Sequence, residues 1–282
     1  MEISWSLVFY TLFVGLGMGA FAFVAITEYL GKAEKSRMAG AIITLVAMVA
    51  GGISSALHLG HVERVANVLA NLESHIAQEL ILVIVVGAFV VLYIALLIAN
   101  ASDILRKIVV TLGLLAAIAL AFMNGLIYVL PSRPAWNTVL WPLLYTASAA
   151  VLGLFTMYIW EALREGEVSV VKGVNKWSVI TLAVYGALII AYVIYLAMAP
   201  FPAESRSPAR LLTGDLAWIF WGGVVAIGLA VPLGMTAWLW SSKQEKVPFL
   251  ATAVVGLACT FVGAVAIRAL MYALGTSIQQ FL

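Results

Sequence analysis

The chain has 282 residues, of which 64% are hydrophobic and only 10% are charged, and its formal net charge is +2. A water-soluble domain of this composition would need a largely apolar surface, so a soluble protein is excluded. The small net charge gives no reason to expect a nucleic-acid partner. Apolar segments of about 20 residues recur along the chain, and each is long enough to cross a bilayer as a helix.

These segments predict an all-α polytopic membrane protein, a bundle of eight transmembrane helices that forms a single domain over residues 1–282. The first segment lacks the basic start of a signal peptide and is too long for one, so we expect a retained helix. The single cysteine, Cys259, excludes an internal disulfide and an iron–sulfur cluster held by this chain alone. The expected spans are 3–30, 38–59, 75–99, 108–130, 138–163, 177–199, 216–240 and 247–274.

Lysine and arginine in the short loops predict the orientation. The odd-numbered loops hold Lys32, Lys35, Arg37, Arg106, Lys107, Arg164, Lys172, Lys176, Lys243 and Lys246. The even-numbered loops hold Arg64, Arg133, Arg206 and Arg210. This bias places the odd loops in the cytoplasm. We therefore expect a multi-pass protein of the cytoplasmic membrane of a prokaryote, with both termini outside.

The stretch Ser54–Glu79 gathers the proton chemistry of the chain. It contains all three histidines, His58, His61 and His75, together with Glu63, Glu73 and Glu79. Within it, residues 60–74 show apolar side chains at helical spacing, which predicts a short amphipathic helix at the outer membrane interface. Such a helix would act as a lid or as a ledge on which a partner docks.

His58 and Glu79 are the candidate catalytic pair. His58 ends the second span, whereas His75 and Glu79 are four residues apart and share one face of the third span. A short connection makes the two helices probable neighbours in the bundle, so a histidine and a glutamate are expected to meet at the edge of the hydrocarbon. Histidine titrates near pH 6.5, and desolvation moves a carboxyl group towards that range. Such a pair fits quinol oxidation, which releases two protons and two electrons.

Other interpretations of the same residues remain open. His58 and Glu79 would serve merely as interfacial anchors of helix ends, or as a proton relay in an ion- or proton-coupled transporter or channel. One haem between His58 and His75 is a further alternative, but no histidine pairs occur at two depths, so we expect no haem. The spacing of His58 and His61 lacks further convincing ligands, so we expect no metal site.

The sequence also supports predictions about five other features. The small residues Gly15–Ala20 favour close helix packing, and Glu28 is expected to be solvated near the inner end of the first span. Tyr128 is a candidate ligand-binding hydroxyl, or alternatively an interfacial tyrosine. Arg268 lies inside the last span and needs a polar partner, with Glu79 and Asp215 as candidate acids. Interfacial belts are predicted from Trp5, Trp136, Trp141 and Trp218 at one face, and Trp160, Trp177, Trp238 and Trp240 at the other.

The chain resembles a known family at two places. One is the run His58-Leu59-Gly60 with Arg64, Asn67, Leu69, Ser74 and Glu79; the other is Tyr128 with Pro134-x-Trp136 and Trp141-Pro142. These motifs are similar to those of the membrane anchor subunit of dimethyl sulfoxide reductase, within the wider group of polysulfide-reductase-type quinone-interacting anchors.

The resemblance implies an anchor that binds menaquinol and carries no haem. It also implies two partners: a four-cluster iron–sulfur subunit that takes the electrons, and a molybdopterin catalytic subunit that the iron–sulfur subunit feeds. By the same resemblance, His58 and Glu79 belong to the quinol site and Arg64 has a supporting role. His61 and His75 match no position of the family motif.

Overall fold

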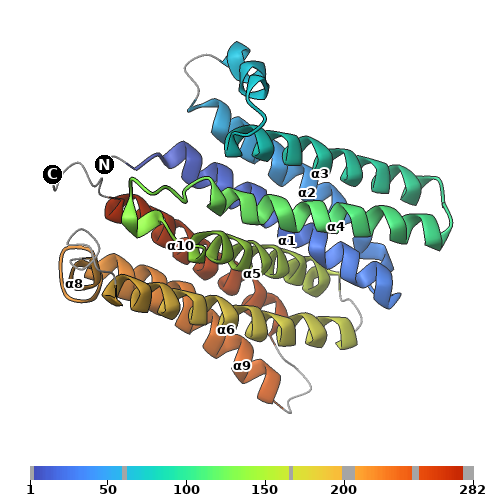
Figure 1. Cartoon of the computed structure of the whole chain (residues 1–282). Coiled ribbons are helices and arrows are strands. Elements are labelled where there is room, and N and C mark those ends of the chain that lie inside the picture. The colour runs from blue at the N-terminus through green and yellow to red at the C-terminus, as the bar shows by residue number, and fades with distance from the viewer. Residues whose placement is uncertain (1–2, 59–61, 165–167, 199–206, 243–247, 276–282) are drawn as a thin grey trace.

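Every regular element in the described part of the chain is a helix (Figure 1). The computed structural model describes residues 3–58, 62–164, 168–198, 207–242 and 248–275. Within these residues, eight helices are long and apolar enough to cross a membrane, which confirms the predicted fold class. They are α1 (Trp5–Leu30), α2 (Glu34–Ala56), α3 (His75–Ile98), α4 (Asp103–Leu126), α5 (Leu140–Leu163), α6 (Val168–Met198), η3 continuing into α9 (Ile219–Ala230 and Val231–Ser241) and α10 (Phe249–Leu274).

Three helices begin earlier than hydropathy predicts: α4 begins at Asp103, ahead of the expected residue 108, and the other two are α2 and α6. α2 begins at Glu34 and α6 at Val168, ahead of the expected residues 38 and 177. Lys172 and Lys176 lie in the added turns of α6. Lysine is a good helix former, and its long side chain can reach water from a helix end near the membrane boundary. The apolar run therefore marks the hydrocarbon crossing, while the helix itself continues beyond it.

The seventh span changes its winding along its length. Its first part, η3, is a π-helix, and the α-helix α9 follows it with Pro232 in its first turn. Proline has no backbone N–H, so Pro232 donates no hydrogen bond to the preceding turn. A π-helical stretch directly before a proline is a way for the chain to accommodate this missing bond.

α1 lies within the bundle and connects its two halves (Figure 1). We call α1–α4 the first half of the bundle and α5–α10 the second half. α1 packs against α2 and α4 of the first half and against α5 of the second half. One apolar core is shared by α1, α2, α3 and α4, and a larger one by α5, α6, η3 and α10. Side chains of α1 enter both cores, so polar residues on this helix can bring together groups from either half.

Glycines allow α1 and α5 to approach closely. A Cβ atom at Gly19 would lie 2.0 Å from the carbonyl oxygen of Ala149, and one at Gly153 would lie 2.1 Å from the carbonyl carbon of Gly19. Neither position can carry a side chain at this separation. The expectation that Gly15–Ala20 serves close helix packing is confirmed.

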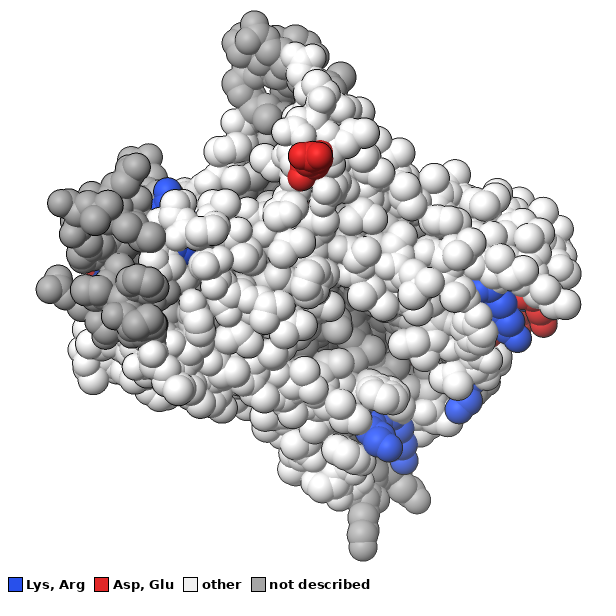
Figure 2. Space-filling model, in the orientation of Figure 1, with Lys and Arg blue, Asp and Glu red and all other residues white. Residues whose placement is uncertain are grey.

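The outer surface has the character of a membrane-facing belt. Figure 2 shows a face that is mostly white, with lysine and arginine towards the ends of the helices. Large apolar side chains that point outward include Ile84, Val91, Leu115, Ile190 and Val254. Because lipid is as apolar as these side chains, this exposure costs nothing in a bilayer.

Three short helices lie outside the spans in the described part of the chain. η1 (Val62–Ala70) follows α2 and projects beyond the bundle (Figure 1), and α8 (Ser207–Leu212) precedes η3. η1 falls within the segment 60–74, for which a short interfacial amphipathic helix is predicted; its position relative to a membrane stays a prediction. A third short helix, η2 (Pro134–Trp136), lies between α4 and α5.

Candidate functional site

Glu79 occupies a core-facing position of α3. The helix begins at His75, and its buried residues are Ala77, Glu79, Val86, Val90 and Tyr93. From Glu79 onward, successive buried residues are seven, four and three positions apart, which is the spacing of one helix face. The carboxyl group of Glu79 therefore lies on the apolar stripe that packs into the bundle. We call this end of the bundle, where α1 begins, α2 ends and α3 begins, the Glu79 end.

The carboxyl group of Glu79 is buried and only partly satisfied. The residue is 6% exposed, and the hydroxyl of Tyr10 on α1 is its hydrogen-bonding partner. Its Oε1 atom is buried with no hydrogen-bond partner among the described residues. A buried acceptor without a partner is uncommon in folded proteins, and intramembrane carboxyl groups are typical of functional sites. Oε1 is therefore free to accept a hydrogen bond from a ligand.

The structure does not join His58 to Glu79. His58 lies just after the last turn of α2 and is exposed. Its Nδ1 atom is 3.2 Å from the Ser4 hydroxyl. No hydrogen bond or ion pair links the two candidate residues, so the expected direct contact between them is absent, although both lie at the Glu79 end.

Of the other candidate residues in the stretch Ser54–Glu79, one is exposed and two have side chains outside the described part of the chain. His75 is the first residue of α3 and is exposed. Arg64 lies in η1, but its side chain is outside the described part of the chain, and His61 lies outside the described residues altogether. Among the side chains of Ser54–Glu79 that the structure describes, Glu79 is thus the one ionisable group buried in the bundle.

Tyr128 belongs to a buried aromatic cluster at the Glu79 end. It is 6% exposed, and its hydroxyl is 3.0 Å from that of Tyr272 on α10. The rings of Trp136, Tyr145 and Tyr272 lie 5.7 to 5.9 Å from its ring centroid. Burial raises the pKa of Tyr128 well above its ordinary value, and Tyr145, Tyr272 and the charge of Glu79 raise it further. Tyr128 is therefore a buried hydroxyl within electrostatic reach of Glu79, and its assignment to an interfacial belt is wrong.

Two of the predicted belt tryptophans are also buried. Trp136 is 4% exposed and Trp141 is fully buried. Their indole nitrogens donate to the carbonyl oxygens of Met271 at 2.7 Å and Ala135 at 3.1 Å. Trp5 and Trp218 are half exposed or more, as a membrane interface requires. The belt prediction is therefore wrong for Trp136 and Trp141, because η2 folds back against α10 and carries the first of them into the bundle.

Arg268 is a buried cation without an acidic partner in the described part of the chain. Its Nε donates to the Thr11 hydroxyl at 3.1 Å, and its Nη1 to the Ser148 hydroxyl at 3.3 Å. The guanidinium carbon lies 4.5 Å from the ring centroid of Tyr145, a cation–π contact. Its Nη2 atom is buried and has no hydrogen-bond partner within the described residues. The expected pairing with Glu79 or Asp215 is wrong.

Asp215 pairs with a different arginine. Its carboxylate accepts hydrogen bonds from Nε and Nη2 of Arg210, at 3.0 and 2.7 Å. This hydrogen-bonded guanidinium lowers the pKa of Asp215 below its ordinary value. The two residues are five positions apart in the chain and largely exposed, so this ion pair forms without any long-range contact.

Adjacent residues of α1 connect the acidic and basic sides of the site. Tyr10 interacts with Glu79, and Thr11 accepts a hydrogen bond from Arg268. Hydropathy alone does not predict that Tyr10 and Thr11 contact these groups, because a single tyrosine and threonine near a span end are ordinary at a membrane interface. This end of the bundle thus holds a buried carboxyl group, buried tyrosine hydroxyls and a buried cation.

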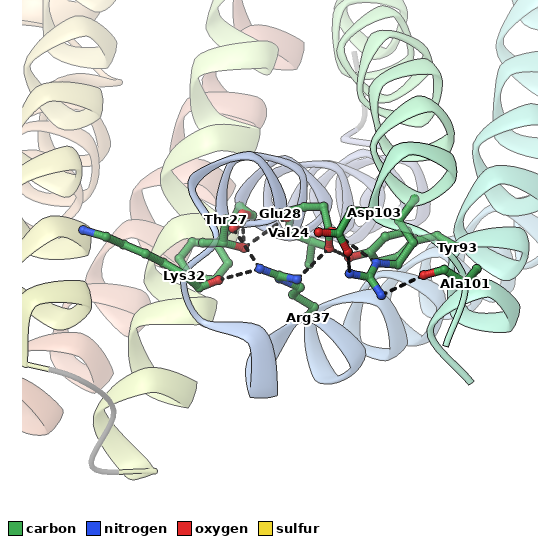
Figure 3. A network of polar contacts seen from close by, with 10 residues as sticks. Val24, Thr27, Glu28, Lys32, Arg37, Tyr93, Ala101 and Asp103 are labelled. Carbon is green, nitrogen blue, oxygen red and sulfur yellow. Dashed lines mark hydrogen bonds and ion pairs between the residues drawn. The ribbon is translucent and has the colours of Figure 1, made fainter. Parts of the chain in front are cut away.

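A second polar cluster lies at the opposite end of α1, which we call the Glu28 end (Figure 3). Glu28 is 2% exposed, so the expectation that it is solvated is wrong. Its carboxylate lies 3.0 Å from Nη1 of Arg37 and 3.2 Å from Nε of Arg106, and it accepts a hydrogen bond from Tyr93 at 2.6 Å. Residues of α1, α2, α3 and α4 meet here, which makes the cluster a clamp of the first half of the bundle.

The two polar centres are separated by apolar packing along α1. From Tyr10 to Glu28 the helix rises about 27 Å, close to the thickness of a hydrocarbon core. The buried side chains on this part of α1 that enter the first core are Val14, Met18, Phe21, Val24 and Ala25. The Glu79 site is therefore located near one membrane surface, and the Glu28 cluster near the other.

Comparison with protein families gives a match over most of the chain. The family described as polysulphide reductase, NrfD, matches residues 1–274. No curated protein matches the chain at a significant level. Among the described residues, no group of three or more histidine, cysteine or acidic side chains is placed to hold a metal ion. The chain therefore belongs to the polysulphide reductase NrfD family, whose members are quinone-interacting membrane subunits of molybdoenzyme complexes.

Proposed function

We propose that the chain is the membrane anchor and quinol-oxidising subunit of a complex of the dimethyl sulfoxide reductase type. Menaquinol binds at the Glu79 end and gives its electrons to a four-cluster iron–sulfur subunit, which passes them to a molybdopterin subunit. The observation that carries the proposal is the buried Oε1 atom of Glu79, which has no hydrogen-bond partner among the described residues. The identity of the partners rests on the motif resemblance around His58 and Tyr128.

Each side chain has a specific part in this proposal. Glu79 accepts a proton from a quinol hydroxyl at Oε1, while Tyr10 holds the other side of the carboxylate in place. A positioned general base of this kind contributes about 10²- to 10⁴-fold to a rate. His58 is exposed at the same end of the bundle, so it is suited to contact the edge of the head group and to transfer protons to water. Tyr128 supplies a hydroxyl within electrostatic reach of Glu79.

The proposal places the iron–sulfur subunit on the Glu79 end. Electrons leave the quinol there, so the accepting cluster must be close to that end. η1, which carries Arg64, projects from this end and would form part of the docking surface (Figure 1). The alternative function, a proton relay through the membrane, gains less support, because the side chains that α1 buries between Tyr10 and Glu28 are largely apolar.

A photoreactive menaquinone analogue tests the location of the site. Cross-linking in native membranes is expected to label peptides that contain Tyr10 or Glu79, and added menaquinol is expected to suppress the label. The control is a photoreactive lipid with the same tail and no quinone ring, whose labelling menaquinol should not suppress. Competed labelling confined to peptides around Glu28 or Arg106 would contradict the proposal.

The proposed orientation has both termini outside the cytoplasm. Reporter fusions after Lys35 and after Ser207 are expected to report cytoplasm and exterior respectively, because the basic loops are retained in the cytoplasm. An alkaline phosphatase and a fluorescent-protein fusion at each position provide opposite readouts. The reversed pattern would place the Glu79 end in the cytoplasm, and the partner subunits with it.

A further inference from the structure

A groove lies between α1, α5 and α6, away from the proposed quinol site. Its volume is about 330 Å³, and its walls include Phe23, Leu154, Val170 and Val174. On α1 it extends from Gly19 to Leu30, which is about 17 Å along the helix axis, and Lys32 lies just beyond the end of this helix. One leaflet of hydrocarbon is about 15 Å thick, so the groove spans the leaflet at the Glu28 end and reaches its polar boundary.

The groove has apolar walls because its hydroxyl groups are already satisfied. The Thr27 hydroxyl donates to the carbonyl oxygens of Phe23 at 2.9 Å and Val24 at 3.0 Å. The Thr181 hydroxyl bonds in the same way to Trp177 at 2.9 Å and Ser178 at 3.2 Å. A quinone ring would need partners for its carbonyl oxygens, whereas a hydrocarbon chain would need none.

A cationic side chain lies at the mouth of the groove. Lys32 lines it and is exposed, and Figure 3 shows its side chain extending away from the Glu28 cluster, towards α5 and α6. Trp177 lines the same groove and is 56% exposed, as an interfacial tryptophan is. An apolar channel with an ammonium group at its polar end is complementary to an amphiphile with a negative head group.

We propose that this groove binds an anionic phospholipid, with one acyl chain between α1, α5 and α6 and the phosphate at Lys32. The lipid fills the space between the two halves of the bundle at the Glu28 end. It is a separate site from that of the quinol, because it lies at the opposite end of α1 from Tyr10 and Glu79.

The test uses the full-length protein, purified with its associated subunits and stripped of lipid. Phosphatidylglycerol or phosphatidylcholine is added back, and bound lipid is counted by native mass spectrometry. Wild type is expected to bind phosphatidylglycerol more tightly. Lys32→Gln is expected to weaken that binding about fivefold, since one basic side chain near a lipid head group contributes about that factor. Binding of phosphatidylcholine should change little.

A filled groove provides the second measurement. A Cβ atom at Gly173, which lines the groove, meets no atom within 4 Å, so the side chain of Gly173→Leu starts in open space and occupies part of the groove. This variant is expected to bind less of the added phosphatidylglycerol than the wild type. The control for the charge change is Lys172→Gln, because Lys172 is an exposed lysine outside the groove. The control for the added side chain is Gly222→Leu, because a Cβ atom at Gly222 also meets no atom within 4 Å but this residue lines a different pocket. Neither control should change lipid binding.

Three results would overturn the proposal. One is equal binding of phosphatidylglycerol by wild type, Lys32→Gln and Gly173→Leu. The second is equal affinity of the wild type for the anionic and the zwitterionic lipid. The third is the loss of bound menaquinone, rather than phospholipid, from Gly173→Leu, which would assign the groove to a quinone.

Discussion

Glu79→Gln is expected to slow menaquinol oxidation by about 10²-fold or more, the usual scale for the loss of a general base. The amide keeps the shape of the side chain and can still bond to Tyr10, so quinone binding should persist. It cannot accept a proton at the atom that faces the ligand. Steady-state turnover with a menaquinol analogue measures the loss, and the Kd of a quinone-site inhibitor measures retained binding.

Controls separate a defect of the site from a defect of assembly. Electron transfer from an artificial donor that reduces the catalytic subunit directly should survive in Glu79→Gln, provided that the subunits stay on the membrane. Glu73→Gln is the matched variant, since Glu73 is an exposed acid shortly before α3 and should leave turnover unchanged. Wild-type turnover in Glu79→Gln would place the proton acceptor elsewhere and leave Glu79 a structural residue.

His58 and His75 provide a second matched pair of variants at the same end of the bundle. Both are exposed, but only His58 is assigned to the quinol site. His58→Ala is expected to weaken quinone binding as well as turnover, because a ligand contact is lost, whereas His75→Ala should affect neither. Equal effects of the two changes would show that His58 has no specific contact with the quinol.

Glu28→Gln is expected to produce the largest loss of stability. The change leaves the guanidinium groups of Arg37 and Arg106 at a buried site without the carboxylate that they share. Removing one partner of a buried ion pair typically lowers the free energy of unfolding by about 3–5 kcal/mol. Turnover of molecules that remain folded should be nearly normal, because the proposed quinol site is at the other end of α1. The midpoint of thermal unfolding in detergent measures the effect.

Asp103 offers a control within the same cluster. It pairs with Arg106, but its side chain is 73% exposed, so the solvent screens the interaction. Asp103→Asn is expected to change the free energy of unfolding by about 0–1 kcal/mol. An unchanged midpoint in Glu28→Gln, or equal effects of the two substitutions, would mean that the buried carboxylate does not clamp the four helices.

The amino-acid sequence was sufficient to predict the eight spans and the all-α class, whereas the location of the quinol site stays a prediction. Hydrophobicity is a local property that sums along one helix, so a span can be recognised without knowing its neighbours. The acids and histidines of Ser54–Glu79 stand out for the same reason, since ionisable groups are rare in this chain. The family match agrees with that prediction at the level of a quinone-interacting subunit.

Only the tertiary structure decided which of these groups are buried and what they contact. Glu28, Trp136 and Trp141 lie near span ends, where water or lipid head groups would ordinarily be their neighbours, and yet all three are inside the bundle. Tyr10 and Arg268 acquire their roles from residues on other helices. Such partnerships depend on which faces of which helices meet, and on glycines that let α1 and α5 touch. That information is not local to any one span, so hydropathy and spacing could not predict it.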